Sequence, residues 1–362
     1  MHILVVSGHS PFSKRKVDLH FLADAWKAQG HTVSFIRLGS SVLHSLISRS
    51  SDPRSVVSAN RWYSSKDVRF FDWVPFFHFF KQPFRFLDRL FRLYPLQFPR
   101  HALQALSPAP DVIVVESGSG LALIPLFKKT FPEARIIYSV SDRLARLNVP
   151  PILHRIEKDV LPLCYIIRVP SPLMVQDFAG HGDVRVILHG LAIDLFSKEY
   201  PSPYRTEKTA VYVGDSLMDH DALAQLAANF PDWQFHVFGQ GGANHPYPQN
   251  VTCYGEVGFE EIIPYIKHAA IGLALYTATQ GGDYIRDSSM KMIQYRYCGL
   301  PQVVPDLYSP DDPRCCAYKI GDAASLDTAF RQAQAMGRSQ SHDFYVADWV
   351  DTAAEFLKEQ QV

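Results

Sequence analysis

Short apolar runs alternate with amphipathic stretches along most of the chain. Residues 2–7 have the unbroken apolar pattern of a buried strand, residues 17–29 have the spacing of a helix that ends at Gly30, and residues 31–38 again have the pattern of a strand. A strand, a helix and a second strand in this order make a βαβ unit, whose strands are parallel. The pattern therefore predicts an α/β fold that begins with a parallel sheet.

The same alternation continues through both halves of the chain. Residues 40–72 are less regular, with short strands expected at Val56-Val57 and Trp62-Tyr63. Further strands are predicted at residues 111–116, 134–140, 165–169, 184–188, 209–214, 234–238, 251–256 and 271–276. Helices are predicted at residues 219–229, 259–268, 323–335 and 347–361.

A charged, proline-containing stretch at residues 194–209 separates the halves and is predicted to be a linker. A chain of 362 residues with 47% apolar content is long enough to bury two cores. We therefore predict two Rossmann-like, doubly wound parallel-sheet domains that face each other, residues 1–193 and 205–345. The helix in residues 346–362 is expected to pack back toward the N-terminal domain.

Residues 283–301 have the pattern of a helix with both ends marked. Asp287 or Ser288 is expected to cap its N-terminus, and Gly299 and Pro301 end it. Lys291 lies in the first turn, where the helix dipole disfavours a cation, so a bound anion would compensate it. Gln294 follows on the same face. The segment therefore indicates a holder for a diphosphate and a sugar; the alternative is a capped surface helix with a solvated lysine.

Residues 70–94 are dense in phenylalanine and arginine. On a helix entered near Pro83, cationic side chains line one side next to bulky aromatic ones. The predicted contact residues are Lys81, Phe84, Arg85, Arg89, Phe91 and Arg92. Basic flanks around aromatic residues are typical of an interfacial helix attracted to anionic lipid. The alternative is an ordinary amphipathic helix that packs on the sheet and extends its arginine side chains to solvent.

The formal net charge is zero, but it is unevenly distributed. Residues 1–190 hold 24 Lys+Arg against 14 Asp+Glu, a net of +10, and the remaining residues carry a net of −10. The first half is therefore expected to face an anionic membrane surface. Nucleic acid fits less well, because the cationic side chains interleave with phenylalanine.

The cysteines and the N-terminus indicate the compartment. The five cysteines form no CxxC pair and no signal peptide is evident, which indicates a reducing, cytosolic compartment. No apolar run is long enough to span a membrane.

Two doubly wound domains around one cleft suit sugar transfer from a nucleotide. This reaction needs a carboxylate to take the acceptor proton and donors to neutralise the departing diphosphate. Asp142 follows a predicted strand and is the candidate base, although an aspartate there is often a helix cap. Glu256 is a candidate ribose contact and Tyr276 a candidate cleft residue; the alternatives are a solvated turn and a core-edge aromatic. No metal or other cofactor is indicated, because the histidines His9, His189 and His245 show no ligand spacing, and Lys291 with helix N–H groups would supply the charge instead.

The chain resembles the GumK family of xanthan glucuronosyltransferases, which are inverting enzymes of the GT-B fold. The matching segments occur in order across both halves. They are residues 115–118 (Val-Glu-Ser-Gly), 141–142 (Ser-Asp), 147–149 (Leu-Asn-Val), 254–256 (Tyr-Gly-Glu), 265–269 (Tyr-Ile-Lys-His-Ala), 287–295 (Asp-Ser-Ser-Met-Lys-Met-Ile-Gln-Tyr) and 299–301 (Gly-Leu-Pro). The resemblance implies the GT-B fold, with residues 1–193 as the acceptor- and membrane-facing domain and residues 205–345 as the nucleotide-sugar domain.

The resemblance also implies substrates and residue roles. UDP-glucuronate is the implied donor and a polyprenyl-diphosphate-linked oligosaccharide the implied acceptor, without metal, at the cytoplasmic face of a bacterial inner membrane. Asp142 falls on the position of the family's general base. Donor-site positions fall on Tyr276, Met290, Lys291 and Gln294, and a nucleotide contact on Glu256. Ser216 stands at a further donor-site position, where the family motif has methionine.

These observations lead to one hypothesis and three alternatives. The hypothesis is a peripheral-membrane, inverting, metal-independent glycosyltransferase of exopolysaccharide synthesis, in which Asp142 activates the acceptor and Lys291 stabilises the departing UDP. The enzyme alternatives are a transferase that uses another UDP-hexose and a sugar-nucleotide epimerase of the same architecture. The non-enzyme alternative is a membrane-bound binding module.

Overall fold

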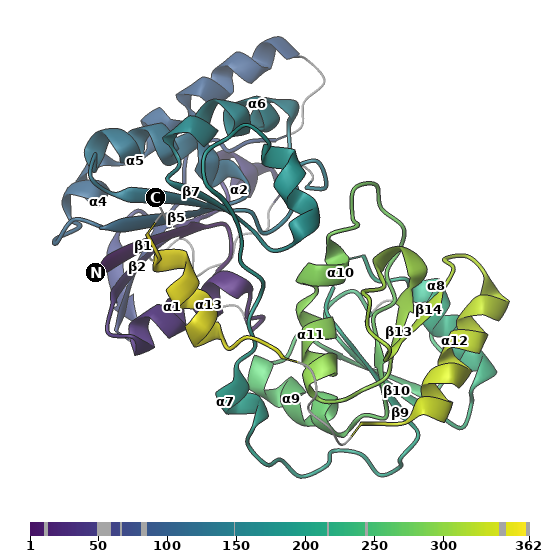
Figure 1. The fold of residues 1–362 in the computed structure, drawn as a ribbon. Helices are drawn as coiled ribbons and strands as arrows, with labels where there is room; N and C mark the ends of the chain where they lie inside the picture. Colours follow the sequence, from purple (N-terminus) through teal and green to yellow (C-terminus); the bar gives the residue numbers. More distant parts are fainter. Residues whose placement is uncertain are drawn as a thin grey trace. The chain divides into compact units, whose positions relative to one another are not determined.

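The computed structural model describes residues 1–10, 14–48, 59–65, 67–80, 85–147, 149–215, 217–242, 245–339 and 345–359. The chain divides into two compact units (Figure 1). The first unit contains Met1–Ser13, Val17–Ile187 and Val350–Val362, and the second contains Lys14–Lys16 and Leu188–Trp349. Each unit is built on its own sheet.

The sheet of the first unit has eight strands in the order β3-β4-β2-β1-β5-β6-β7-β8. All neighbouring strands are parallel except β3 and β4, which pair antiparallel. The strands are β1 His2–Ser7, β2 Thr32–Leu38, β3 Trp62–Ser65, β4 Val68–Trp73, β5 Val112–Glu116, β6 Arg135–Ser139, β7 Ile166–Val169 and β8 Val184–Val186. The three central strands are nearly continuous apolar runs because helices cover both faces of the sheet.

Figure 1 shows α1 and α13 on one face of this sheet and α5 and α6 on the other. The helices of the first unit are α1 Asp18–Ala28, α2 Val42–Ser48, η1 Arg85–Gln97, α4 Arg100–Gln104, η2 Ser119–Leu123, α5 Ile124–Thr130, α6 Pro151–Val160, η3 Leu161–Leu163, η4 Pro172–Phe178 and α13 Trp349–Leu357. The indole of Trp26 in α1 donates to the Ala353 carbonyl of α13 at 2.9 Å, and its ring meets Phe356 edge-on. The far C-terminal helix thus completes the core of the first unit.

The sheet of the second unit has six parallel strands in the order β11-β10-β9-β12-β13-β14. The strands are β9 Thr209–Val213, β10 Gln234–Phe238, β11 Val251–Gly255, β12 Ile271–Leu273, β13 Gln302–Pro305 and β14 Cys315–Tyr318. The helices are α7 Ile193–Phe196, α8 His220–Asn229, α9 Phe259–His268, α10 Ile285–Ser288, α11 Met290–Tyr297, η5 Asp306–Tyr308 and α12 Ala323–Met336. Alternate residues of β9 point to opposite faces: Tyr212 packs in the cluster with α8 and α12, and Val211 in the cluster with α9 and α11.

Chain order reverses once in each sheet. In the first sheet, β2 to β4 are added on one side of β1, and the chain then returns to place β5 on the other side of β1. In the second sheet, β10 and β11 are added on one side of β9, and the chain then returns to place β12 on the other side. A doubly wound sheet binds ligands at this switch point, outside the carboxyl ends of the two strands. The topology therefore marks two places for functional residues, one in each unit.

The predicted α/β fold with two parallel-sheet units is confirmed. The strand expected at Trp62-Tyr63 is β3, whereas Val56-Val57 lie outside the described residues. Two local details differ from the expectation. The predicted linker contains the short helix α7 at its start, and the predicted helix within residues 283–301 begins later than expected, because Ser289 rather than Asp287 or Ser288 caps α11 and the short helix α10 precedes it.

Candidate active site

Helix α11 is fixed against the switch point of the second sheet by Tyr295. The Tyr295 hydroxyl lies 3.1 Å from the Val211 carbonyl oxygen of β9 and 3.3 Å from the Leu273 carbonyl oxygen of β12, so its single proton bonds to either strand. Its ring lies on Gly272, where a Cβ would come within 2.5 Å of the ring. The absence of a side chain at residue 272 therefore lets α11 approach the sheet closely.

The N-terminus of α11 is tied to the strand edge as well. Ser289, rather than the predicted Asp287 or Ser288, is the cap, and its hydroxyl accepts from the Met292 amide. The same hydroxyl lies 2.7 Å from the Tyr276 hydroxyl. Tyr276 follows β12, so this contact orients the tyrosine and the first turn of α11 together.

Lys291 projects from this first turn between two aromatic rings. Its ammonium nitrogen lies 3.8 Å from the centroid of the Tyr212 ring and 4.6 Å from that of the Tyr276 ring. The nitrogen is enclosed and forms no hydrogen bond within the described part of the chain. Cation–π contact offsets part of the cost of desolvating the ammonium, but its three N–H donors have no acceptor among the described residues. A buried, unmatched ammonium is the expected signature of a site that receives an anion.

The enclosure changes the acidity of Lys291. Burial lowers its pKa to about 7, because desolvation disfavours the charged form. The lysine also passes directly over the turn after β9: a Cβ at Gly214 would lie 3.3 Å from the Lys291 nitrogen. Gly214 has a φ of +119°, which favours glycine for a second, conformational reason.

The other predicted donor-site residues lie on nearby segments of the second unit. Gln294 is buried one turn after Lys291, and its side-chain oxygen has no hydrogen-bond partner among the described residues. Met290 is the first residue of α11 and is half-buried. Glu256 follows β11 and accepts a hydrogen bond from the Gln240 side chain in the loop after β10. Ser216 lies outside the described residues.

The structure thus brings Tyr276 and Lys291 into contact and adds Tyr212, which the sequence did not single out. The sequence feature that could have identified Tyr212 is its position two residues before Gly214, near the end of a strand that lies beside the switch point. Its ring supplies the shorter of the two contacts to the Lys291 nitrogen.

Asp142 belongs to the first unit and lies beyond the carboxyl end of β6. Its carboxylate is half-exposed and lies 3.8 Å from a guanidinium nitrogen of Arg146. A half-exposed carboxylate at the carboxyl edge of a parallel sheet is accessible to a ligand. Among the described residues, no group of three or more His, Cys, Asp or Glu side chains is placed to hold a metal ion.

The predicted membrane residues map onto the start of η1. Lys81 and Phe84 lie outside the described residues, and the side chain of Arg85 is likewise not described. Arg89 and Arg92 are exposed. Phe91 is only 2% exposed and packs against the Phe79 and Phe80 rings, so its predicted role in membrane contact is wrong.

The reason for this error is the pitch of η1. A helix with three residues per turn aligns positions three apart, whereas an α-helix distributes them around its axis. Phe91 and Tyr94 therefore share a buried ridge, and Leu90, Leu93 and Leu96 form a parallel ridge that is 52%, 47% and 76% exposed. None of the helices in the described ranges is long and apolar enough to cross a bilayer.

Solved structures of glycosyltransferases superpose on this chain. A sucrose-phosphate synthase from Thermosynechococcus elongatus superposes with a TM-score of 0.63 at 13% identity, over 98% of this chain and 93% of that one. A glycosyltransferase from Rickettsia africae superposes with a TM-score of 0.58 at 12% identity, over 98% and 91% of the two chains. At this level of identity the likeness concerns the fold, which is GT-B.

The sequence comparisons are more specific. Residues 5–170 match the family profile described as the N-terminal domain of the glucuronosyltransferase GumK. Across 98% of its length the chain is 34% identical to a UDP-glucuronate:glycolipid 2-beta-glucuronosyltransferase of Xanthomonas campestris pv. campestris, and the match covers 88% of that protein. This chain is therefore a glycosyltransferase that belongs to the GumK glucuronosyltransferase family.

Proposed function

We propose that this protein transfers glucuronic acid from UDP-glucuronate to a polyprenyl-diphosphate-linked oligosaccharide, with inversion, at an anionic membrane surface. The single observation that carries the proposal is the enclosed Lys291 ammonium without a hydrogen-bond partner among the described residues, at the switch point of the second sheet. The choice of donor and of a glycolipid acceptor is supported by the name of the Xanthomonas relative.

On the donor side, the diphosphate would lie at the start of α11. There the first-turn N–H groups and Lys291 meet its negative charge, and a bound diphosphate would favour the charged form of the lysine. Tyr276, Met290 and Gln294 surround the same turn, and Glu256 belongs to a loop at the carboxyl edge of the sheet. Ser216 remains a candidate donor contact by its position in the sequence alone. This positive end stabilises the charge that develops on UDP as the glycosidic bond breaks.

On the acceptor side, Asp142 would act as the general base. Its carboxylate takes the proton of an acceptor hydroxyl, the oxygen of that hydroxyl attacks the anomeric carbon, and UDP leaves from the opposite face of the sugar. The half-exposed position of Asp142 suits this role, because a base must reach the proton that it removes.

The charge on Lys291 also bears on metal dependence. Because Lys291 and the N-terminus of α11 supply the positive charge that the departing diphosphate needs, we propose that transfer is metal-independent. We expect the rate to persist in excess EDTA; loss of activity in EDTA that Mg²⁺ restores would contradict this.

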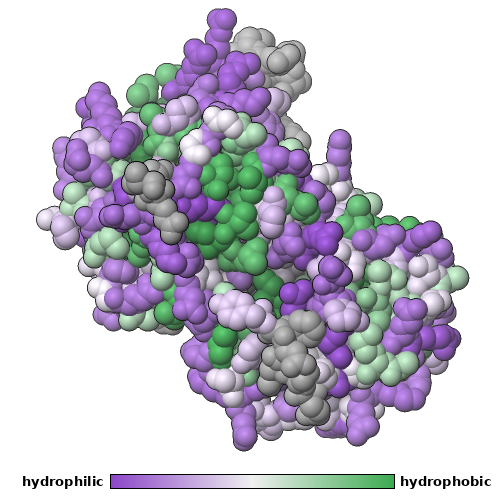
Figure 2. All heavy atoms as spheres, in the orientation of Figure 1, coloured by the Kyte–Doolittle hydropathy of each residue, from purple (hydrophilic) through white to green (hydrophobic). Residues whose placement is uncertain are grey.

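Membrane contact would be made by η1. Its exposed leucine ridge (Leu90, Leu93 and Leu96) offers apolar surface, and Arg89 and Arg92 on the neighbouring ridge offer positive charge for an anionic headgroup. Figure 2 shows a further apolar area, in green, on the face of the first unit that it draws. The first half of the chain, with its net charge of +10, is the half that suits an anionic surface.

Flotation with vesicles that contain phosphatidylglycerol tests this contact. We expect the wild type to float, and a variant with Leu90, Leu93 and Leu96 changed to Asp, or with Arg89 and Arg92 changed to Glu, to remain at the bottom of the gradient. The matched control is Leu307→Asp, because Leu307 is also half-exposed but belongs to the second unit. Equal flotation of all these proteins would end the membrane proposal.

The donor is tested by measuring transfer from UDP-glucuronate, UDP-glucose and UDP-N-acetylglucosamine to glycolipid extracted from bacterial membranes. We expect UDP release and a labelled glycolipid with UDP-glucuronate. Isomerised UDP-sugar in the absence of glycolipid would instead identify an epimerase. No binding of UDP at millimolar concentration would favour a binding module.

A further inference from the structure

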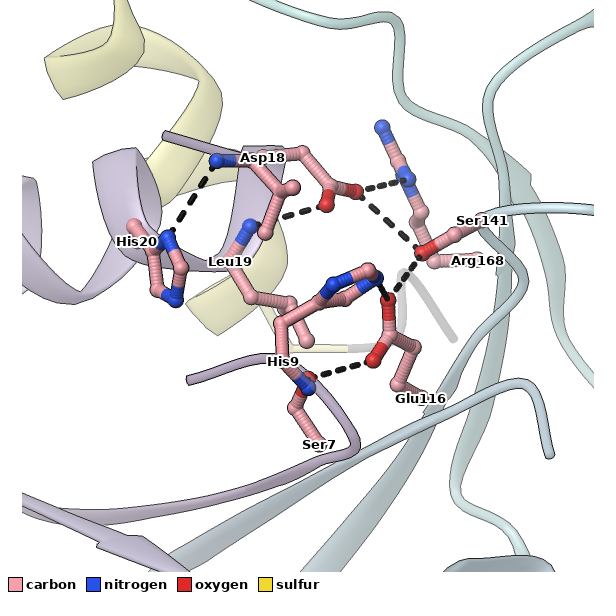
Figure 3. Close-up of polar contacts among 9 residues, drawn as sticks. Ser7, His9, Asp18, Leu19, His20, Glu116, Ser141 and Arg168 are labelled. Atoms are coloured by element: carbon pink, nitrogen blue, oxygen red, sulfur yellow. Dashed lines mark hydrogen bonds and ion pairs between the residues drawn. The ribbon is translucent and has the colours of Figure 1, made fainter. Parts of the chain in front are cut away.

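The first sheet also has a polar cluster at its switch point, which the proposed transfer does not use (Figure 3). Ser7 ends β1, Glu116 ends the adjacent strand β5, and Ser141 follows β6. The Ser7 hydroxyl donates to one oxygen of Glu116, and the Ser141 hydroxyl lies 3.3 Å from the other. Three neighbouring strand ends thus converge on a single carboxylate.

His9 is the outer member of this cluster. Its Nε2 lies 3.5 Å from Glu116 Oε1, and the His9 amide donates to the Ser7 hydroxyl, which holds the backbone of the loop. The His9 side chain is 48% exposed, whereas that of Glu116 is only 8% exposed. An accessible imidazole therefore rests on an enclosed carboxylate.

The inner side of the cluster is anchored by a second carboxylate. The Ser141 hydroxyl lies 3.3 Å from Asp18 as well as from Glu116, so its one proton serves either carboxylate. Asp18 is balanced by the fully buried Arg168, whose guanidinium lies 3.6 Å away. Glu116 has no such inner cation among the residues that Figure 3 labels, so the polar groups that stabilise its carboxylate are the Ser7 and Ser141 hydroxyls and the His9 imidazole.

The surroundings of Glu116 shift its pKa in opposing ways. Burial raises the pKa of the Glu116 carboxyl, and the neighbouring Asp18 raises it further, whereas His9 and the two serine hydroxyls lower it. The interaction with His9 therefore works in both directions: the carboxylate orients the imidazole, and the imidazole stabilises the carboxylate. A carboxylate next to one ring nitrogen of a histidine determines which nitrogen carries the proton and which one accepts a hydrogen bond.

We propose that His9, oriented by Glu116, is a binding site for a sugar hydroxyl of the acceptor. A carboxylate oxygen 3.5 Å from Nε2 favours the neutral tautomer with its proton on Nε2, which leaves the opposite ring nitrogen, Nδ1, as a hydrogen-bond acceptor, and the described residues make no hydrogen bond to Nδ1. A neutral, hydroxyl-bearing ligand matches this acceptor and the half-exposed ring. His9 binds and positions the acceptor and Glu116 positions His9, while the removal of the acceptor proton remains with Asp142. This inference rests on the proposed function, because it places the acceptor on the first unit.

The probes for this site are octyl β-glucoside and octyl α-mannoside, with octanol as the sugar-free comparison. Isothermal titration below the micelle-forming concentration gives their affinities for wild type, His9→Gln and Glu116→Gln. We expect a glycoside to bind more tightly than octanol, and both variants to weaken glycoside binding about tenfold, the usual effect of one lost hydrogen bond. The affinity for UDP should stay unchanged, because His9 and Glu116 belong to the first unit.

Matched controls are His101→Gln and Glu133→Gln, which change exposed residues of the same unit and should bind the glycosides as the wild type does. If Glu116→Gln fails to fold, His9→Gln carries the test, because its side chain is half-exposed. A wild type that binds neither glycoside more tightly than octanol, or a His9→Gln variant with wild-type glycoside affinity, would overturn the proposal. Failure to bind UDP would count against the proposed transferase instead, so the two failures are distinguishable.

Discussion

The two switch points of this molecule share a topology and differ in chemistry. In the first unit, strands β1 and β5 end on Glu116, which is surrounded by hydroxyls and an imidazole. In the second, strands β9 and β12 end beside Lys291, which is enclosed by tyrosine rings. One site therefore presents acid and hydroxyl groups, and the other presents a cation with no hydrogen-bonded acceptor among the described residues.

This difference teaches that the doubly wound sheet fixes where a ligand binds but not which ligand. The side chains at the strand ends determine the ligand, and here one site carries a negatively charged side chain and the other a positively charged one. A cation with no hydrogen-bond acceptor among the described residues suits a diphosphate, and a hydrogen-bonded acid cluster suits a neutral, hydroxyl-rich group. If this is right, a change at Lys291 affects UDP binding, and a change in the first unit affects the acceptor.

The largest effect is expected from Asp142→Asn. The amide keeps the shape of the side chain but cannot take a proton, so we expect the rate of transfer to fall about 10²–10⁴-fold while UDP affinity stays the same. Single-turnover transfer and titration with UDP measure the two quantities. Arg146→Gln is the companion variant, because it removes the guanidinium beside Asp142 and leaves the carboxylate. Transfer at the wild-type rate by Asp142→Asn would remove this residue from the mechanism.

The reverse pattern is expected from Lys291→Met. Methionine fills much of the lysine volume without charge, and loss of a charge-assisted contact of about 1.5–3 kcal/mol should weaken UDP binding roughly 10- to 100-fold. Lys319→Met, which changes an exposed lysine of the same unit, should bind UDP normally. If Lys291→Met retains wild-type UDP affinity, the contrast between the two switch points loses its electrostatic basis.

The pKa of Lys291 also predicts how UDP binding depends on pH. Since burial lowers this pKa to about 7, the free protein must take up a proton to bind the anion at higher pH. We expect the Kd for UDP to rise with pH above about 7, by up to tenfold per pH unit. The terminal phosphate of UDP titrates near pH 6, so the quantity to compare is the ratio of the wild-type Kd to that of Lys291→Met. A ratio that is constant from pH 6 to 9 would show that the lysine is charged throughout.

A smaller effect, on stability, is expected from Gly272→Ala. The new Cβ would come within 2.5 Å of the Tyr295 ring and displace α11 from β12. Overpacking of this kind costs about 1–3 kcal/mol, so the Tm of the second unit should fall and UDP binding should weaken with it. Gly182→Ala is the control in the first unit, because a Cβ there meets nothing within 4 Å. An unchanged Tm for Gly272→Ala would show that α11 is not held as tightly as Tyr295 indicates.

The sequence predicted the alternation of elements well, and for a physical reason. Parallel strands covered on both faces must be apolar throughout, and the helices between them must have one apolar side. Helix α9 therefore lies at the predicted residues, Phe259–His268, and Lys291 lies in the first turn of a capped helix as expected. The roles of Asp142, Lys291 and the other site residues remain predictions for the experiments above.

Features that depend on contacts between distant segments were not predictable. The break at Ser289 arises because its hydroxyl meets Tyr276 and the Met292 amide, and nothing in the local sequence selects it over Asp287 or Ser288. Phe91 was assigned to the membrane side because an α-helical pitch was assumed for η1. The polar cluster of Ser7, His9, Glu116 and Ser141 joins four residues whose sequence spacing carries no signal.

The position of α13 has a consequence for the order in which the protein is made. Trp26 bonds to Ala353, and Phe356 packs on Trp26 and beneath the Arg168 guanidinium, so the first unit needs a helix that the ribosome synthesises after the whole of residues 188–349. During translation the second unit can close around its own six strands first, and the first unit, although it emerges earlier, waits for its last helix. A nascent chain stalled before residue 349 should therefore expose the Trp26 side of the first sheet to chaperones.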